Sequence, residues 1–582
     1  MTQSKESGGY GGGMRTPPGR PMPGLFPPSE SLRPTVVGTR YAVSAGHPLV
    51  AQAAAAILDQ GGNAIDAGVA GGLVANVVQA DMANFGGIAP TVVRTSAGEM
   101  VSISGVGVWS RDISLQKFLA RYGGDIPLGM PAAIVPAAPD AWITALSSFG
   151  TYSFNQVVAS AVRFAEEGFA LDARTASSLK VLSGGFRQWA SSCSIYYPNG
   201  IEPHVGQVLR QPALARLLRA MAAAERGPTR RAALDNVRRY FYEGEPAELI
   251  VRAVVAGGGW MNLEDLRSFH CEVDSPVAFP YGNYVVHTPG TWTQGPALLI
   301  ALGILDRLGL RDIEHNSAEY IHLTSQAIRV AMRERETFRP GPEPAPDVAQ
   351  ILSAEAIDRQ VKQVVASELD SSSGDRRPTR RRADTTYLCV VDGDGNAFSS
   401  TPSDTLDGGP VIPELGIIVS PRGVQSWVDP KHPAVLAPGK RPRVTPAPAL
   451  AVERDSGAHL LAFGSPGGDV IAQAMLQVFL NAVHFRMTLQ QAVEAPRFGV
   501  FGFPNSFHPH SAGELHLRLE QRLSDEVAEA VSRNGYPIFR WGDWDFDAGG
   551  VSIVGDVARA DPGVRILGGG ADPRRSCYAM AR

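Results

Sequence analysis

The chain has 582 residues, of which 44% are hydrophobic and 19% are charged, and its formal net charge at pH 7 is −4. This length and composition predict a globular protein with two domain-sized units or one large composite core. The small net charge does not favour a nucleic acid or a membrane surface as a partner. No stretch approaches the roughly 18 apolar residues of a membrane span.

The four cysteines are scattered, without a CxxC pair or metal-ligand spacing, so we expect neither a disulfide framework nor a metal site. Residues 1–35 are rich in glycine, proline and serine and are predicted to be disordered. They contain no apolar core of a secretory signal, which favours a cytoplasmic location.

Residues 41–104 predict a strand at the start, two helices with a Gly61-Gly62 stop between them, and two further strands. The expected ranges are 41–44, 47–60, 63–78, 91–94 and 100–104. The second helix, 63–78, is rich in small residues, which predicts close packing against a neighbouring element. Residues 130–330 are mostly helical by apolar spacing. His315 and His322 lie in this region without an HExxH pattern, so we expect ordinary core or surface histidines.

The stretch 384–404 predicts a β-hairpin. An alternating apolar run at 387–391 indicates a half-buried strand, a glycine-rich turn follows, and 397–401 predicts the returning strand. Such a hairpin brings Ser403 close to Thr385. The preceding RRPTRRRAD is too charged to pack in a core, which suggests a processing point before Thr385. An ordinary hairpin after a surface loop is the alternative, and this stretch alone favours it.

Gly467 and Gly468 precede a predicted helix at 472–485. A glycine turn at a helix start presents backbone N–H groups outward, which suits an oxyanion or a phosphate. A simple glycine turn is an equal alternative. The stretch is no Walker A loop, because no Gly-Lys-Ser/Thr follows.

Seven motifs, in order and spanning residue 40 to the C-terminus, resemble the gamma-glutamyltransferase family of N-terminal-nucleophile hydrolases. They are GHPLVAQAAAAILDQGGNAIDA (46–67), NFGGIAP (84–90), DTTYLCVVDGDGNAFS (384–399), GKRPRVTPAPAL (439–450), GSPGGD (464–469), QQAVEAPRF (490–498) and GGADPRR (569–575). The resemblance implies an α+β fold, a four-layer αββα sandwich, and a precursor that cuts itself before a threonine.

By this resemblance the cut falls between Asp384 and Thr385 and leaves a large subunit region, 36–384, and a small one, 385–582, in one composite domain. Thr385 then carries a free α-amino group, with a reference pKa of about 7.7–8.0, which can act as base for its own hydroxyl. Ser403 is implied to orient that hydroxyl. The N–H groups of Gly467 and Gly468 are implied to line the oxyanion hole. No cofactor is implied.

The chain departs from the family where the amino-acid head group of a gamma-glutamyl substrate binds. The arginine that clamps the α-carboxylate falls near Val106, although Arg111 is close by. The paired serines fall on Val444 and Thr445. The position that receives the substrate ammonium falls near Gln425, and a neighbouring glutamine position falls on Arg422.

Arg422 could instead hold a carboxylate bidentately. We therefore expect hydrolysis of a small anionic amide, as in the branch of the family that includes oxamate amidohydrolase. True gamma-glutamyl transfer, a cephalosporin or glutaryl acylase and an unprocessed, non-catalytic member are the alternatives. The expected partners are the amide substrate and the two subunits of one precursor, and a homodimer of such pairs is left open.

Overall fold

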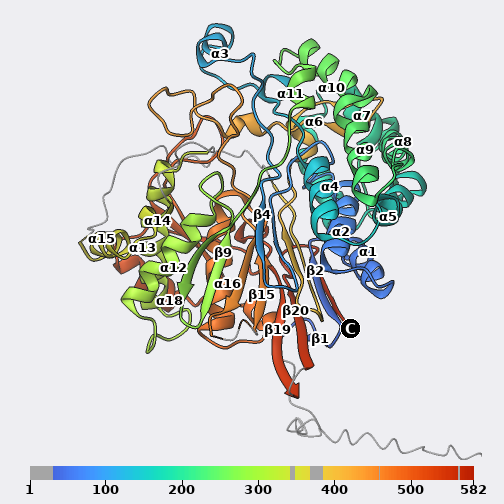
Figure 1. Ribbon diagram of the computed structural model, residues 1–582. Coiled ribbons are helices and arrows are strands. Elements are labelled where there is room, and N and C mark those ends of the chain that lie inside the picture. Colours follow the sequence, from blue (N-terminus) through green and yellow to red (C-terminus); the bar gives the residue numbers. More distant parts are fainter. Residues whose placement is uncertain (1–30, 341–347, 367–383, 456, 458, 562–563) are drawn as a thin grey trace, which may run out of the picture.

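The computed structural model describes residues 31–340, 348–366, 384–455, 457, 459–561 and 564–582. Two seven-stranded antiparallel sheets lie at the centre, and helices lie on both sides of them (Figure 1). This confirms the predicted α+β architecture of four αββα layers.

The first sheet carries the predicted hairpin at its centre. Its strands, in spatial order, are β21 (Tyr578–Ala581), β2 (Tyr41–Ala45), β10 (Leu388–Asp392), β11 (Ala397–Ser400), β3 (Thr91–Arg94), β4 (Met100–Ile103) and β7 (Val273–Asp274). In the second sheet the order is β1 (Val36–Gly38), β20 (Val564–Ala571), β19 (Ser552–Asp561), β15 (Leu460–Gly464), β14 (Ala449–Glu453), β9 (Tyr284–Thr288) and β8 (Val277–Tyr281).

Successive side chains of β10 point to opposite faces of the first sheet, and each face is covered by a different layer. Leu388 and Val390 point into the helices beside the first sheet. Cys389 and Val391 point into the narrow core between the two sheets. The prediction of a half-buried strand was therefore wrong, because all five residues of β10 are buried. A strand covered on one face by helices and on the other by a second sheet has no solvent side.

The helical layers follow the apolar patterns. The main helices beside the first sheet are α1 (Pro48–Asp59), α2 (Ala64–Val78), α4 (Ala138–Phe149), α5 (Phe154–Glu167), α8 (Pro212–Ala223), α9 (Arg230–Glu243) and α10 (Glu245–Ala256). Beside the second sheet are α12 (Gly295–Leu308), α13 (Ala318–Glu334), α15 (Ala354–Ala366), α16 (Ile471–Val483), α17 (Leu489–Glu494) and α18 (Asp525–Arg533). Helix α2 is buried along its whole length, as its small residues predicted.

The chain also contains further helices and smaller sheets. The helices are α3 (Leu115–Tyr122), α6 (Ala173–Phe186), α7 (Ala190–Tyr196), α11 (Leu263–Arg267) and α14 (Val348–Ile351). A small third sheet contains β16 (Phe498–Phe501), β17 (His516–Glu520) and β18 (Ile538–Trp541), and two two-stranded ribbons pair β5 (Phe169–Ala170) with β6 (Val208–Leu209) and β12 (Val411–Ile412) with β13 (Ile417–Ile418).

Parts of two predicted segments lie outside the described residues, namely 1–30 and all of RRPTRRRAD except Asp384. The described end of the first segment is anchored, because the backbone N–H groups of Leu32 and Arg33 donate to the Glu494 carboxylate. In the described ranges no helix is both long and apolar enough to cross a membrane. Within the same ranges no three His, Cys, Asp or Glu side chains are grouped to hold a metal ion.

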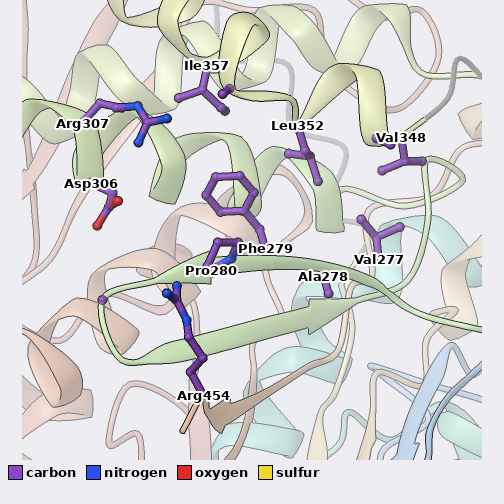
Figure 2. A pocket seen from close by; sticks show the side chains of 13 residues that line it. Val277, Ala278, Phe279, Pro280, Asp306, Arg307, Val348, Leu352, Ile357 and Arg454 are labelled. Atoms are coloured by element: carbon purple, nitrogen blue, oxygen red, sulfur yellow. The ribbon is translucent and has the colours of Figure 1, made fainter.

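A surface groove of about 850 Å³ follows the free edge of the second sheet (Figure 2). It lies between β8 and the helices α12, α14 and α15, with Phe279 and Leu352 among its apolar walls and Arg307 and Arg454 at its rim. None of the residues predicted for the site lines it.

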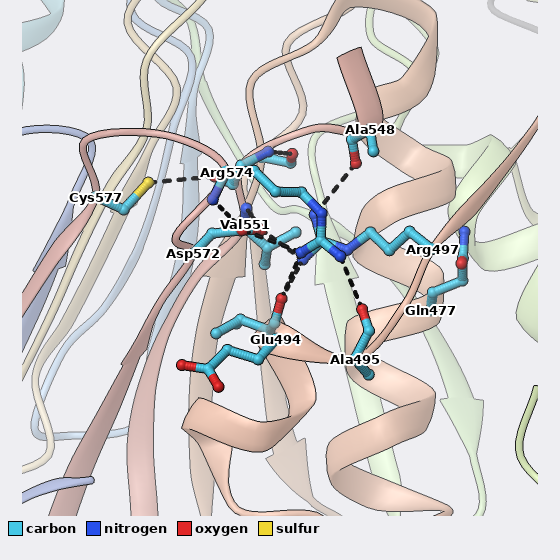
Figure 3. A network of polar contacts seen from close by, with 12 residues as sticks. Gln477, Glu494, Ala495, Arg497, Ala548, Val551, Asp572, Arg574 and Cys577 are labelled. Atoms are coloured by element: carbon cyan, nitrogen blue, oxygen red, sulfur yellow. Dashed lines mark hydrogen bonds and ion pairs between the residues drawn. The ribbon is translucent and has the colours of Figure 1, made fainter. Parts of the chain in front are cut away.

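Ion pairs between buried side chains hold the C-terminal motif ADPRR in place (Figure 3). Asp572 lies between two guanidinium groups, 2.5 Å from Arg497 Nη2 and 3.1 Å from Arg574 Nη1. Arg574 also forms a two-pronged pair with Glu520, at 2.6 and 2.7 Å. Although burial would raise it, the pKa of Asp572 is held below its usual value by Arg497 and Arg574.

Replacing Asp572 with Asn should lower the free energy of unfolding by about 3–5 kcal/mol, because two buried guanidinium groups would lose a shared counter-charge. Denaturant unfolding of the full chain measures this. Asp358→Asn is the matched control, since the Arg307–Asp358 pair is exposed and its loss should cost less than about 1 kcal/mol. Equal losses in the two variants would contradict this account.

Candidate active site

The hairpin of β10 and β11 brings two hydroxyl groups together. Leu388 pairs with Ser400, so the residues before β10 meet the residues after β11. Thr385 and Ser403 form an isolated antiparallel bridge, and their Oγ atoms are 2.8 Å apart. The predicted proximity of Ser403 to Thr385 is confirmed. Both side chains are buried.

The hydrogen bonds of Ser403 determine where the proton of Thr385 points. Ser403 Oγ donates its one proton to the carbonyl oxygen of Asp384, at 3.0 Å. Thr385 must then donate to Ser403 Oγ, which also accepts from Arg422 Nη2. The threonine hydroxyl, the serine hydroxyl and the carbonyl before Thr385 therefore form one proton path, with a cation at its middle.

Arg422 is fixed by three partners. Besides Ser403, its Nε donates to Asp404 Oδ1 and its Nη1 donates to Gln425 Oε1 at 2.9 Å. Asp404 also accepts from Ser420 at 2.5 Å, and its φ of 96° is unusual for a residue with a side chain. Because Arg422 is 2% exposed, it lies inside the site. Its contact with a substrate carboxylate stays a prediction.

Asp384 is held at both of its carboxylate oxygens. Oδ1 accepts from the Thr385 N–H at 2.9 Å, and Oδ2 lies 2.8 Å from Arg575 Nη1. Burial raises the pKa of the Asp384 carboxyl, against the lowering effect of Arg575. Sequence reasoning missed this role of Arg575. Its motif was noted, but no spacing rule relates residues 191 positions apart.

The two neighbouring threonines have different surroundings. Thr386 Oγ1 donates to Gln79 Oε1 at 2.8 Å, and Gln79 in turn donates to the carbonyl of Gly46. Thr386 is therefore bound to the end of α2, on the side away from Ser403. Of the two threonines, only Thr385 has its hydroxyl in contact with Ser403 among the described residues.

Gly467 and Gly468 form the predicted turn before α16, with φ values of 125° and 58° that favour glycine. Among the described residues their N–H groups have no hydrogen-bond partner. The neighbours of this turn include Phe507 and Gly549, and Phe507 connects the turn with Arg422. Phe507 packs near Gly468 and under Arg422, and a Cβ on Gly467 would lie 3.5 Å from Gly549. The oxyanion role of the turn stays a prediction.

The other predicted binding residues divide into two groups. Gln425 contacts Arg422, and Val444 packs in one apolar cluster with Val106 and Phe507. Thr445 is fully buried, and its hydroxyl has no partner among the described residues. Arg111 is exposed instead, with its backbone N–H bound to Asp265, and no contact of the described chain connects it to Thr385.

A buried carboxyl group near the site also escaped the sequence analysis. Asp81, in the loop after α2, is 2% exposed, and its Oδ1 has no hydrogen-bond partner among the described residues. Burial, together with the charges of Asp384 and Asp172, raises the pKa of Asp81 to about 7. Asp81 is therefore largely protonated at mildly acidic pH in the folded protein.

The chain is similar over nearly its whole length to proteins of one family. A family model described as Gamma-glutamyltranspeptidase matches residues 50–581. The chain is 28% identical over 557 residues to the Glutathione hydrolase-like YwrD proenzyme of Bacillus subtilis, with 93% of this chain and 98% of the relative covered. It is 28% identical over 553 residues to the Oxamate amidohydrolase proenzyme of Klebsiella pneumoniae, with coverage of 92% and 98%.

A crystal structure of cephalosporin acylase from Bacillus halodurans has a TM-score of 0.82 to this chain at 26% identity, with 98% and 99% of the two chains covered. With the αββα sandwich, these similarities define the protein as an N-terminal-nucleophile hydrolase, a class of enzyme that acts on amide bonds. Within this class the chain belongs to the gamma-glutamyltranspeptidase family, which confirms the resemblance of the seven motifs.

The protonation of Asp81 should make stability fall as pH rises. Its pKa is raised in the folded state, so between about pH 4 and pH 7 the folded protein binds more protons than the unfolded chain, and the free energy of unfolding decreases. Asp81→Asn should remove this pH-dependent decrease in the free energy of unfolding, which reaches up to about 4 kcal/mol above pH 7. Denaturant unfolding at several pH values compares the two proteins. Parallel pH profiles would contradict the assignment.

Proposed function

We propose that the chain is a precursor that cuts itself between Asp384 and Thr385 and then hydrolyses the amide bond of a small anionic substrate, with Thr385 as the nucleophile. The hydrogen-bonded path from Thr385 through Ser403 to the Asp384 carbonyl is the observation that carries this proposal. The similarity to proenzymes of the same family supports it.

Self-cleavage follows from the proton path. Thr385 Oγ attacks the carbonyl carbon of Asp384 while its proton passes to Ser403, and the proton of Ser403 passes to the carbonyl oxygen. The C–N bond of the adduct then breaks, the nitrogen takes up the proton, and an ester between Asp384 and Thr385 remains. Arg422 stabilises the negative charge that develops near Ser403. The α-amino group of Thr385 is free from this point. Water then hydrolyses the ester, which releases the Thr385 hydroxyl and leaves Asp384 as the new C-terminal carboxylate of the large subunit.

In the cleaved protein that amino group takes the proton of the Thr385 hydroxyl, as its reference pKa of about 7.7–8.0 allows. Thr385 Oγ attacks the substrate carbonyl, the C–N bond breaks, and the amine leaves with the proton. Water then resolves the acyl-enzyme. The turn at Gly467 and Gly468 presents N–H groups for the oxyanion, where the loss of one donor typically costs about 10²–10³ in rate.

Three features favour an anionic amide over a gamma-glutamyl substrate. Arg422 lies beside Ser403. The family's carboxylate-clamping arginine is replaced near Val106, which is buried in an apolar cluster. Its paired serines are replaced by Val444 and Thr445. Oxamate represents the small anionic amides. A cytoplasmic location and two subunits from one precursor complete the proposal, while gamma-glutamyl transfer and acylase activity remain the alternatives.

Thr385→Ala should stay a single chain on a denaturing gel, whereas the wild type should give two bands, because only Thr385 supplies the attacking oxygen. Thr386→Ala is the matched control and should still be cut, since Thr386 contacts Gln79 instead of Ser403. Ser403→Ala should slow the cut by roughly 10²-fold or more, through loss of the donor to the Asp384 carbonyl. Cleavage of Thr385→Ala, or an uncut wild type, would overturn the proposal.

Substrate choice is tested by release of ammonia from oxamate and glutamine, alongside release of the chromophore from a γ-glutamyl anilide. We expect turnover of anionic amides and little of the γ-glutamyl compound. Arg422→Ala should lower kcat/KM on oxamate by roughly 10-fold or more, through loss of a charged hydrogen bond. Rapid γ-glutamyl turnover stimulated by dipeptides would favour gamma-glutamyl transfer, and unchanged oxamate kinetics would remove Arg422 from substrate binding.

A further inference from the structure

Arg575 is a second buried cation at the cleavage point, in contact with the side chain of Asp384. Its guanidinium lies 3.3 Å from the centroid of the Phe546 ring, and its stem packs on Gly550, where a Cβ would come within 2.2 Å of Arg575 Cγ. The side chain is 6% exposed. Its charged partner is Asp384, at 2.8 Å, and its Nε has no hydrogen-bond partner within the part of the chain that is described.

Asp384 occupies this position as the acyl group of the self-cleavage reaction. Its carbonyl accepts from Ser403 while its carboxylate lies against Arg575. After the proposed shift, the Asp384 acyl group is esterified to Thr385 Oγ. This ester has the same bond as the acyl-enzyme that an amide substrate would form. The surroundings of the Asp384 side chain are therefore a template for the acyl group of the substrate.

From this geometry we infer that, once the chain is cut and Asp384 has left, Arg575 binds the carboxylate of the substrate's acyl group. In Asp384 two carbons, Cα and Cβ, separate the carbonyl carbon from the carboxylate carbon, as in a succinyl group. The substrate class is then the monoamides of four-carbon dicarboxylic acids. This inference rests on the proposed amidohydrolase activity and differs from it in the preferred substrate: Arg575 takes the place of Arg422 as the group that binds the acyl carboxylate, and a four-carbon monoamide is preferred over oxamate.

The electrostatics of the pocket support an anionic occupant. Departure of Asp384 leaves a guanidinium in an enclosed site without its counter-charge, which is unfavourable unless another anion replaces it. Arg575 also differs from Arg422 in this respect. Arg422 keeps Asp404 as an ion partner that the cut does not remove, whereas the ion partner of Arg575 is the residue at the cut itself.

The test uses the full chain after self-cleavage and four acyl p-nitroanilides. Succinyl and butyryl anilides have the same chain length and differ in the carboxylate, while oxalyl and glutaryl anilides vary the spacing. We expect kcat/KM for the succinyl compound to exceed that for the butyryl compound by roughly 10- to 150-fold, as for a hydrogen bond to a charged group. Free succinate should inhibit competitively.

Arg575→Met should lose this preference, and Arg575→Lys should keep part of it. The matched control is Arg174→Met, because Arg174 lies over the same Phe546 ring, 5.5 Å from its centroid, without a contact to Asp384. Arg174→Met should retain the preference. If Arg575→Met is not cut, the wild-type comparison of succinyl with butyryl decides alone.

Equal rates on the succinyl and butyryl compounds, or faster turnover of the oxalyl compound, would overturn the inference for Arg575 and leave the proposed amidohydrolase intact. A wild-type chain that neither cuts itself nor hydrolyses any amide would overturn the proposed function and this inference with it.

Discussion

The hydroxyl of Ser403 has one proton to donate and two lone pairs that accept, and all three are used at the start of the central hairpin. The proton goes to the carbonyl of Asp384, and the lone pairs receive Thr385 and Arg422. The hydroxyl proton of Thr385 can therefore point only toward Ser403 Oγ. The pairing of β10 with β11 sets the distance between the two hydroxyl groups, so the register of one hairpin determines the geometry on which the proposed chemistry depends.

The buried charged side chains of this part of the molecule form ion pairs. Arg422 lies with Asp404, Arg575 with Asp384, and Arg497 and Arg574 share Asp572. Such pairs stabilise little relative to apolar packing, but removal of one partner leaves a costly unpaired charge. Of these pairs, Arg575–Asp384 contains a residue of the proposed cleavage point. Self-cleavage would therefore change the electrostatics of the site as well as its covalent structure.

Similarity over nearly the whole chain defines the family, whereas the choice of substrate depends on a few residues around Thr385. The family model matches residues 50–581, and curated relatives are 28% identical over more than 90% of the chain. The residues that would select an acyl group lie on separate elements around Thr385. Val444 and Val106 meet in an apolar cluster, and Arg575 approaches from the end of β20.

Local patterns predicted the local structure closely. The glycine stop, the small-residue helix and the hairpin turn depend on backbone preferences within a few residues, so α1, α2, β10 and β11 end within about a residue or two of their predicted bounds. The approach of Ser403 to Thr385 follows from the same short-range geometry. The resemblance of the motifs supplied the fold class, which periodicity alone left open.

The tertiary structure decided the features that depend on contacts between segments far apart in the sequence. The alternation along β10 predicted one solvent face, but the second sheet covers it. Arg111 was grouped with the site by position and is exposed, whereas Arg575 and Asp81 were passed over and are buried beside the cut. Sequence patterns report the surroundings of a residue within a few positions along the chain. The partners and the pKa of a buried charge are set by groups that folding brings from other layers.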